Sequence, residues 1–114
     1  MIRRGEIYWT NLDPALGAEL RKRRPALVVS NDVNNEHSPT VTVLPLTTAG
    51  MEKAYPFQVK VPAGICAGLE RCKVKAEQVR TVDKRRLVGQ ALGVLPAGLM
   101  VEVDAALRLH LGLG

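Results

Sequence analysis

The sequence predicts a small, mainly β protein: an antiparallel barrel closed by one C-terminal α-helix. The chain has 114 residues, enough for one hydrophobic core but too few for two. Short runs rich in Val, Thr and aromatic residues recur between Pro, Gly and Asn, with little helical pattern between them. Short strands without intervening helices favour an antiparallel barrel over a parallel sheet with crossover helices. One domain, residues 1–114, is therefore expected.

Six strands are predicted, each bounded by turn residues. The first runs over Glu6–Asn11, after Gly5. The second follows a proline, which suits the opening of a strand because it lacks an N–H. β-branched residues and turn residues at the ends place the others. The strands after the first cover Ala26–Ser30, Val41–Leu46, Phe57–Val61, a longer stretch Cys72–Val82, and Val88–Val94.

A helix is predicted at the end of the chain. Pro96 suits a first helical turn, and apolar residues then recur at helical spacing. They are Leu99, Met100, Val103, Leu107 and Leu111. This pattern indicates an amphipathic helix that packs one face on the small sheet.

The charge balance favours a polyanionic partner. Sixteen Lys and Arg against eleven Asp and Glu give a net charge of +5, and the excess is clustered, which favours nucleic acid over an anionic membrane. No apolar run approaches the roughly 20 residues of a spanning helix, and the first residues lack the apolar core of a signal peptide. We expect a soluble, cytoplasmic protein.

Metal and histidine chemistry find no support in the residue spacing. Cys66 and Cys72 do not have a metal-site or redox spacing, and no His lies near them, so reduced structural thiols are expected. His37, in an expected loop, and His110, in the predicted helix, have no evident catalytic partner. No metal and no cofactor are expected.

The basic run before Pro25 is the strongest local signal. Pro25 restricts the preceding residue to extended geometry, so Arg24 is expected to be a fixed guanidinium at the mouth of a strand. Arg21, Lys22 and Arg23 are expected on a mobile loop. A fixed guanidinium fork beside mobile positive charge suits phosphate recognition, although a solvated loop without a ligand is an open alternative.

An ordered set of motifs runs along the whole chain: Arg4–Trp9, Asp13–Glu19, Arg24–Asp32, Ser38–Thr40, Pro45–Thr48, Glu77–Leu87 and Val103–Leu107. Together these motifs resemble the MazF/PemK family of toxins. The resemblance implies a CcdB/Kid/MazF-like, SH3-like barrel. It also implies the toxin of a type II toxin-antitoxin system: an mRNA interferase that cleaves single-stranded RNA sequence-specifically and without a metal. Similar toxins attack the phosphate with the ribose 2′-hydroxyl, leaving a 2′,3′-cyclic phosphate and a 5′-hydroxyl.

The resemblance also implies partners. Similar toxins form homodimers and are neutralised by a cognate MazE-like antitoxin through its acidic C-terminal tail. Single-stranded RNA is the expected substrate, and no membrane is involved.

The same resemblance implies three catalytic residues. The Arg before the strand-opening Pro is Arg24, the Thr at the end of the third strand is Thr47, and a Glu in the first loop is Glu19. A guanidinium and a hydroxyl donor suit the negative charge that grows on a phosphorane. Two alternatives stay open: Glu19 pairs with neighbouring cations, and Thr47 is an ordinary strand residue. The expected RNA-binding residues are Arg21, Lys22, Arg23, Thr48, Gln78 and Arg80.

Strand geometry leaves the facing of the polar residues near Gln78 undecided. The segment 71–77 is one residue shorter than in similar toxins, and such a change flips the facing of a strand or requires a bulge. In a regular strand, Gln78 and Arg80 share one face. Trp9 or Tyr8 is expected to fill the core, and Tyr55 is the better candidate for stacking on a base.

Two other functions compete with the nuclease. A CcdB-like toxin poisons DNA gyrase through protein contacts on the same scaffold, and a regulator without nuclease activity would only bind nucleic acid. The pair Arg24 and Thr47 discriminates, because the nuclease needs both and the gyrase poison uses neither.

Overall fold

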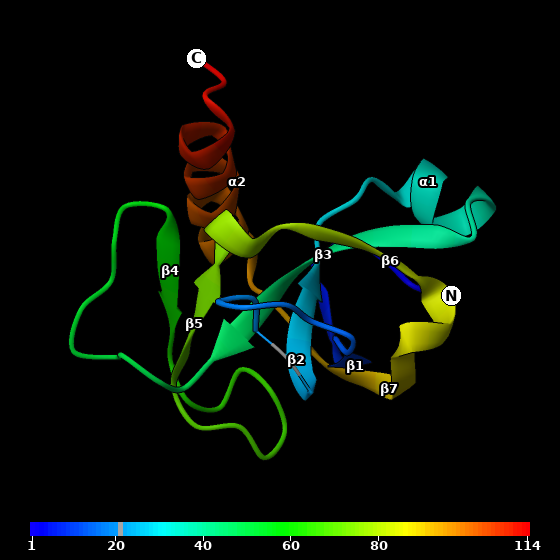
Figure 1. The fold of residues 1–114 in the computed structure, drawn as a ribbon, viewed down its shortest axis with the longest axis horizontal. Coiled ribbons are helices and arrows are strands. Elements are labelled where there is room, and N and C mark those ends of the chain that lie inside the picture. Colours follow the sequence, from blue (N-terminus) through cyan, green and yellow to red (C-terminus); the bar gives the residue numbers. More distant parts are fainter. Residues whose placement is uncertain (21) are drawn as a thin grey trace.

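In a computed structural model, which describes residues 1–20 and 22–114, the chain forms one antiparallel sheet that curls around a core (Figure 1). The sheet order is β4-β5-β3-β2-β1-β7, with β6 also paired to β3. The C-terminal helix α2 packs on β4. The predicted fold class is confirmed. The elements are β1 (Glu6–Asn11), β2 (Arg23–Val28), α1 (Asp32–His37), β3 (Thr40–Thr47), β4 (Gln58–Val61), β5 (Cys72–Lys75), β6 (Arg80–Asp83), β7 (Leu87–Val94) and α2 (Ala97–Leu111).

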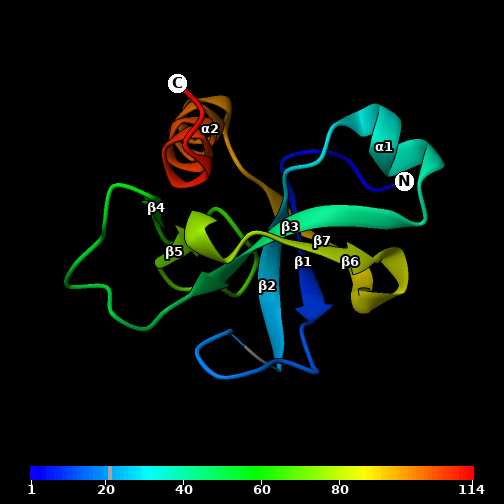
Figure 2. The same ribbon diagram turned by 45° about the horizontal axis from the view of Figure 1, so that its top comes forward.

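Strand β3 is the centre of the sheet (Figure 2). On one edge it pairs with β2, in a register that sets Ala26 opposite Pro45. On its other edge, β6 pairs with the first half of β3, and β5 pairs with its last two residues, Leu46 and Thr47. The end of β3 is therefore held by β5, while its earlier residues are held by β2 and β6.

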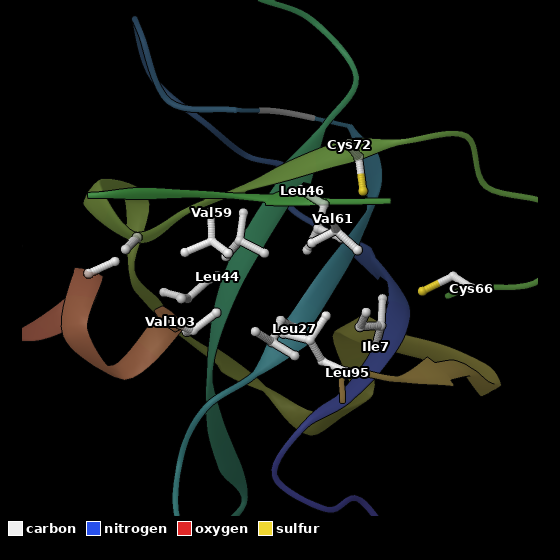
Figure 3. Packing of buried hydrophobic residues seen from close by; sticks show 13 residues of the cluster. Ile7, Leu27, Leu44, Leu46, Val59, Val61, Cys66, Cys72, Leu95 and Val103 are labelled. Atoms are coloured by element: carbon white, nitrogen blue, oxygen red, sulfur yellow. The ribbon is translucent and has the colours of Figure 1, made fainter. Parts of the chain in front are cut away.

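Two apolar clusters fill the interior. The larger cluster lies under α2, β4 and β5 and includes Ile7, Leu27, Leu44, Val103 and both cysteines (Figure 3). The smaller cluster is rich in valine and joins Tyr8 to β2, β3 and β6. Because β2 and β3 contribute to both clusters, their side chains are buried on both faces, and they read as continuous apolar runs.

The predicted long strand Cys72–Val82 is wrong, because a 3₁₀ turn over Ala76–Gln78 divides it into β5 and β6. Thr47 pairs with Lys73 and Val43 pairs with Arg80. The five residues of β3 from Val43 to Thr47 therefore lie opposite the eight residues from Lys73 to Arg80. The three extra residues are looped out in the turn, which closes with a hydrogen bond from Val79 N to Ala76 O at 3.2 Å. Strand alternation therefore does not carry through this segment.

Strand β2 begins at Arg23, three residues before the predicted start. Arg24 and Pro25 consequently lie inside the ladder with β1, opposite Thr10 and Trp9. Pro25 is compatible with this position because its missing N–H removes only one ladder bond. The expectation that Arg23 rides a mobile loop is therefore wrong.

The short helix α1 was not predicted, and His37 is its last residue rather than part of a loop. The side chain of Asn31 caps it by accepting the Asn34 N–H at 2.8 Å. Asn35 is buried and exchanges hydrogen bonds with Ser30. Its segment carries no apolar periodicity, so the cap was the sole signal.

Helix α2 confirms the predicted C-terminal helix. Pro96 is its N-cap, and Gly112, at φ +70°, ends it in the left-handed conformation. Val103 and Ala106 are buried, whereas Leu111 is 53% exposed and does not join the core as its spacing predicted. Among the described residues, no helix is long and apolar enough to cross a membrane.

Close packing at Gly93 fixes the loop between β4 and β5 against β7. A Cβ atom on Gly93 would lie 2.5 Å from the carbonyl oxygen of Ile65, and Ala67 N donates to Leu92 O at 3.0 Å. This loop reaches the candidate site through its last residues, Leu69 and Glu70.

Gly93→Ala should therefore destabilise the protein, by about 1–3 kcal/mol, because backbone atoms must move to admit one methyl group. Gly98 in α2 is the matched control: an added Cβ there meets no atom within 4 Å. Because alanine favours a helix, Gly98→Ala should stabilise by about 0.5–1 kcal/mol. Urea unfolding would measure both changes; equal stabilities for the two variants would contradict the packing argument.

Candidate functional site

Two cavities of similar size lie near the start of β2 and the end of β3. The first, here called the Thr47 cavity, has a volume of about 210 Å³. It is lined by Trp9, Arg23, Arg24, Pro25, Leu46, Thr47, Thr48, Leu69, Glu70 and Cys72. The second, here called the Glu19 cavity, also has a volume of about 210 Å³ and is lined by Leu12, Glu19, Leu20, Pro45, Glu77, Gln78, Val79 and Arg80.

The Thr47 cavity brings together Arg24 and Thr47. The register between β2 and β3, extended by two residues beyond Ala26 and Pro45, sets Arg24 level with Thr47. Residues at the same level on antiparallel strands point to the same face. Two side chains that are distant in the sequence are thus placed together by strands rather than by loops.

Thr47 is a buried hydroxyl with a defined hydrogen bond. Its side chain is 5% exposed, and Oγ1 accepts the N–H of Ala49 at 3.1 Å. Thr48, the next residue, is exposed on the rim of the same cavity. The hydroxyl of Thr47 is therefore held by the chain that follows β3.

The remaining walls combine apolar surface with charge. Of the two aromatic residues expected as candidates for the core, Tyr8 is buried in it, whereas Trp9 is half-buried and lines the cavity. The guanidinium of Arg23 lies over the Trp9 ring, 5.9 Å from its centroid. Burial raises the pKa of the Cys72 thiol to about 11, so this wall is a neutral thiol at neutral pH.

Glu19 lies in the neighbouring cavity rather than beside Thr47. Its Oε1 accepts the Leu16 N–H at 2.8 Å and closes a short turn in the first loop. None of the described ion pairs includes Glu19. Glu77 shares this cavity; its Oε1 is buried without a hydrogen-bond partner among the described residues, while Oε2 accepts from Gln58 at 2.6 Å.

Gln78 and Arg80 hold the first loop. Gln78 accepts the Leu20 N–H at 2.7 Å and donates to Ala18 O at 3.2 Å. Arg80 donates to Leu12 O at 2.6 Å and to Pro14 O at 3.3 Å. The turn over Ala76–Gln78 gives these side chains their direction, which strand alternation could not supply.

The described residues of the basic run do not all lie in the same element. Arg23 and Arg24 belong to β2, and Lys22 precedes them with φ +67°, its N–H donating to Asp13 Oδ1 at 3.0 Å. Arg21 lies outside the described residues. Tyr55, the candidate for base stacking, is 46% exposed, and its ring is stacked on Phe57 with centroids 5.5 Å apart.

No three His, Cys, Asp or Glu side chains come together to hold a metal ion in the described part of the chain. The cysteines are free and buried, in agreement with the expected structural thiols.

Comparisons with known proteins identify the family of the chain. Residues 3–111 match the family described as PemK-like, MazF-like toxin of type II toxin-antitoxin system. The chain is 42% identical to endoribonuclease MazF9 of Mycobacterium tuberculosis, over 99% of this chain and 98% of that protein. It is 37% identical to endoribonuclease EndoA of Bacillus subtilis, over 99% and 97%.

Solved structures show the same fold. MazF of Deinococcus radiodurans superposes with a TM-score of 0.83 at 33% identity, covering 97% of this chain and 96% of that one. A mycobacterial endoribonuclease in complex with its cognate antitoxin gives 0.79 at 29% identity, covering 100% and 98%.

Proposed function

Because the chain belongs to the PemK-like, MazF-like family of toxins from type II toxin-antitoxin systems, we propose that it is a sequence-specific endoribonuclease that cleaves single-stranded RNA, messenger RNA above all. Its relatives MazF9 and EndoA are named endoribonucleases. An enzyme with this substrate acts in the cytoplasm.

One observation carries the proposal: Arg24 and Thr47 line the same cavity. When a ribose 2′-hydroxyl attacks the adjacent phosphorus, the new P–O bond creates a phosphorane with extra negative charge. Breaking the bond to the 5′-oxygen then leaves a 2′,3′-cyclic phosphate and a 5′-hydroxyl. Donors fixed on strands stabilise that charge more than they stabilise the substrate.

The two donors have different roles. Because guanidinium side chains stay protonated in proteins, Arg24 is proposed first as an electrostatic clamp on the phosphoryl oxygens and second as the donor of the proton that the leaving 5′-oxygen takes up. Thr47 offers a hydroxyl hydrogen to the same phosphoryl oxygens. The proton of the attacking 2′-hydroxyl needs an acceptor, and Glu19 is the proposed one. Its carboxylate would reach the ribose from the Glu19 cavity.

The remaining cations supply RNA affinity. Arg21, Lys22 and Arg23 are proposed to contact the phosphate backbone, where each neutralised phosphate releases counterions. Thr48 contributes at the rim of the Thr47 cavity. Gln78 and Arg80 are proposed to act on RNA chiefly through the loop that they hold, because their described hydrogen bonds go to that loop.

Two assembly states follow from the family. A MazE-like antitoxin is the proposed inhibitor, since similar structures include such complexes. We also propose a homodimer. Its support here is the exposed apolar surface on α2, where Val101 is 68% and Leu109 57% exposed.

The gyrase-poison alternative is not favoured. The relatives MazF9 and EndoA are endoribonucleases, and the gyrase poison would leave the cavity lined by Arg24 and Thr47 without a use. A cleavage assay also separates the nuclease from a regulator that only binds RNA.

The first prediction concerns the reaction. The purified protein should cleave a long, weakly structured RNA in excess EDTA and leave 2′,3′-cyclic phosphate and 5′-hydroxyl ends, because the attacking group is the substrate's own hydroxyl. RNA with a single 2′-deoxyribose at the mapped cut site should resist cleavage there. Loss of activity in EDTA, restored by Mg²⁺, would contradict the proposed chemistry.

A second prediction concerns the catalytic pair. Arg24→Ala and Thr47→Ala should each lower kcat by about a hundredfold or more, because each removes a donor to charge that develops in the transition state. Arg24→Lys should restore little, since an ammonium lacks the planar fork. Arg85→Ala, at an exposed arginine outside both cavities, is the control. Parental rates for both alanine variants would show that these residues are not catalytic.

The third prediction concerns the antitoxin. An acidic, disordered C-terminal tail of the partner should compete with RNA for the basic surface near β2, so its affinity should fall with salt. Arg24→Ala should still bind the partner, because most contacts lie outside the catalytic pair. Fluorescence anisotropy of labelled RNA would measure the competition; RNA that stays bound at saturating antitoxin would argue against this surface.

A further inference from the structure

Lys73 stands apart from the other cations of the chain. It is 6% exposed, the only charged side chain among the buried residues that the structure describes. It lies in β5, where its register partner is Thr47. Its neighbours Cys72 and Val74 point into the core, so Lys73 points to the opposite face, shared with Thr47.

The ammonium group of Lys73 binds the loop that follows β3. Nζ donates to Gly50 O at 2.9 Å and to Lys53 O at 3.0 Å. None of the described ion pairs includes Lys73. A buried cation is costly unless it is hydrogen-bonded, so these two carbonyl groups tie the loop to β5.

Gly50 permits this close approach. Its φ is +64°, and a Cβ atom there would lie 3.3 Å from Nζ of Lys73. A side chain at this position would both strain the backbone and press on the ammonium group. The glycine and the lysine therefore form one anchoring contact.

The anchored chain also orients Thr47. Ala49, which precedes Gly50, donates its N–H to Thr47 Oγ1 at 3.1 Å. That bond occupies an acceptor site of the hydroxyl, and no described hydrogen bond takes up its own hydrogen. A hydroxyl group that accepts one hydrogen bond can still donate its own hydrogen to another acceptor.

We infer that Lys73 is a positioning residue for the reaction: by holding Gly50, it keeps the Ala49 N–H on Thr47 and so aims the hydroxyl hydrogen of Thr47 at the scissile phosphate. The inference rests on the proposed nuclease function. Lys73 itself does not line the Thr47 cavity, and it acts through Thr47 without touching RNA.

The test is a double-mutant cycle measured by single-turnover cleavage, with kcat and KM determined separately. Lys73→Met keeps the length of the side chain and removes the ammonium. It should lower kcat about tenfold or more while KM changes less than about twofold, because the lost interaction serves the transition state. In the Thr47→Ala background the same change should cost less than about twofold, because the group on which Lys73 acts is absent.

Lys60→Met is the matched control. Lys60 is the register partner of Lys73 on β4 and is exposed, and its side chain forms no described hydrogen bond; its variant should keep parental kcat and KM. Gly50→Ala keeps the lysine and disturbs the contact from the loop, so it should lower kcat in the same direction and carries the test if Lys73→Met fails to fold. Circular dichroism establishes folding of each variant.

Three results would overturn the inference: parental kcat in Lys73→Met, a rise in KM with kcat unchanged, or losses that multiply with those of Thr47→Ala. Failure of the proposed function looks different, since Thr47→Ala would then cleave at the parental rate. A low rate for Thr47→Ala beside a parental rate for Lys73→Met contradicts the role of Lys73 alone.

Discussion

The site depends on the point at which β3 changes partners. Up to Pro45 the strand is paired with β2, and its last two residues are paired with β5. On the edge that faces β2 the ladder ends at Pro45, and on the opposite edge β6 gives way to β5. The register with β2, extended past Pro45, sets Arg24 level with Thr47, and both residues line the cavity at this end of the two strands.

The surroundings of the cavity are held by side chains rather than by further secondary structure. Gln78 and Arg80 bind carbonyl and amide groups of the first loop, and Lys73 binds the loop after β3. In both cases the hydrogen-bonding groups of a loop backbone are satisfied by residues on one neighbouring segment, 73–80. The 3₁₀ turn lies inside that segment, between Lys73 on β5 and Arg80 on β6, so one segment supplies polar side chains to both loops.

The sequence was sufficient for what depends on local pattern. β1 has the predicted bounds, and α2 begins directly after Pro96, as predicted. It was insufficient for features that depend on which strands pair and in which register. The division of Cys72–Val82 follows from a change in register along β3, which no local pattern records. Trp9 lines the Thr47 cavity, and alternation alone does not predict this, because β1 is covered on both faces: Ile7 lies in the larger cluster and Tyr8 in the smaller.

The candidate site shows the same limit. Arg24 and Thr47 were named from resemblance, and chain pairing explains why they meet. Lys73 and Gly50 do not belong to a recognisable motif. From sequence alone, a lysine in a strand is predicted to be exposed, and a glycine in a loop is predicted to form a turn. Their contact becomes visible only when β5 is placed opposite the end of β3.

The division between strands and loops has a consequence for control of the enzyme. Two of the groups assigned to chemistry, Arg24 and Thr47, lie on strands, whose ladders fix them independently of ligand, whereas Glu19 lies in the first loop. Of the groups assigned to affinity, Lys22 precedes β2 and Thr48 follows β3. An acidic partner that competes for the cations assigned to affinity can exclude RNA without distorting the catalytic pair, because electrostatic attraction acts at longer range than hydrogen-bond geometry. Release of the partner would then restore a site that was never disassembled.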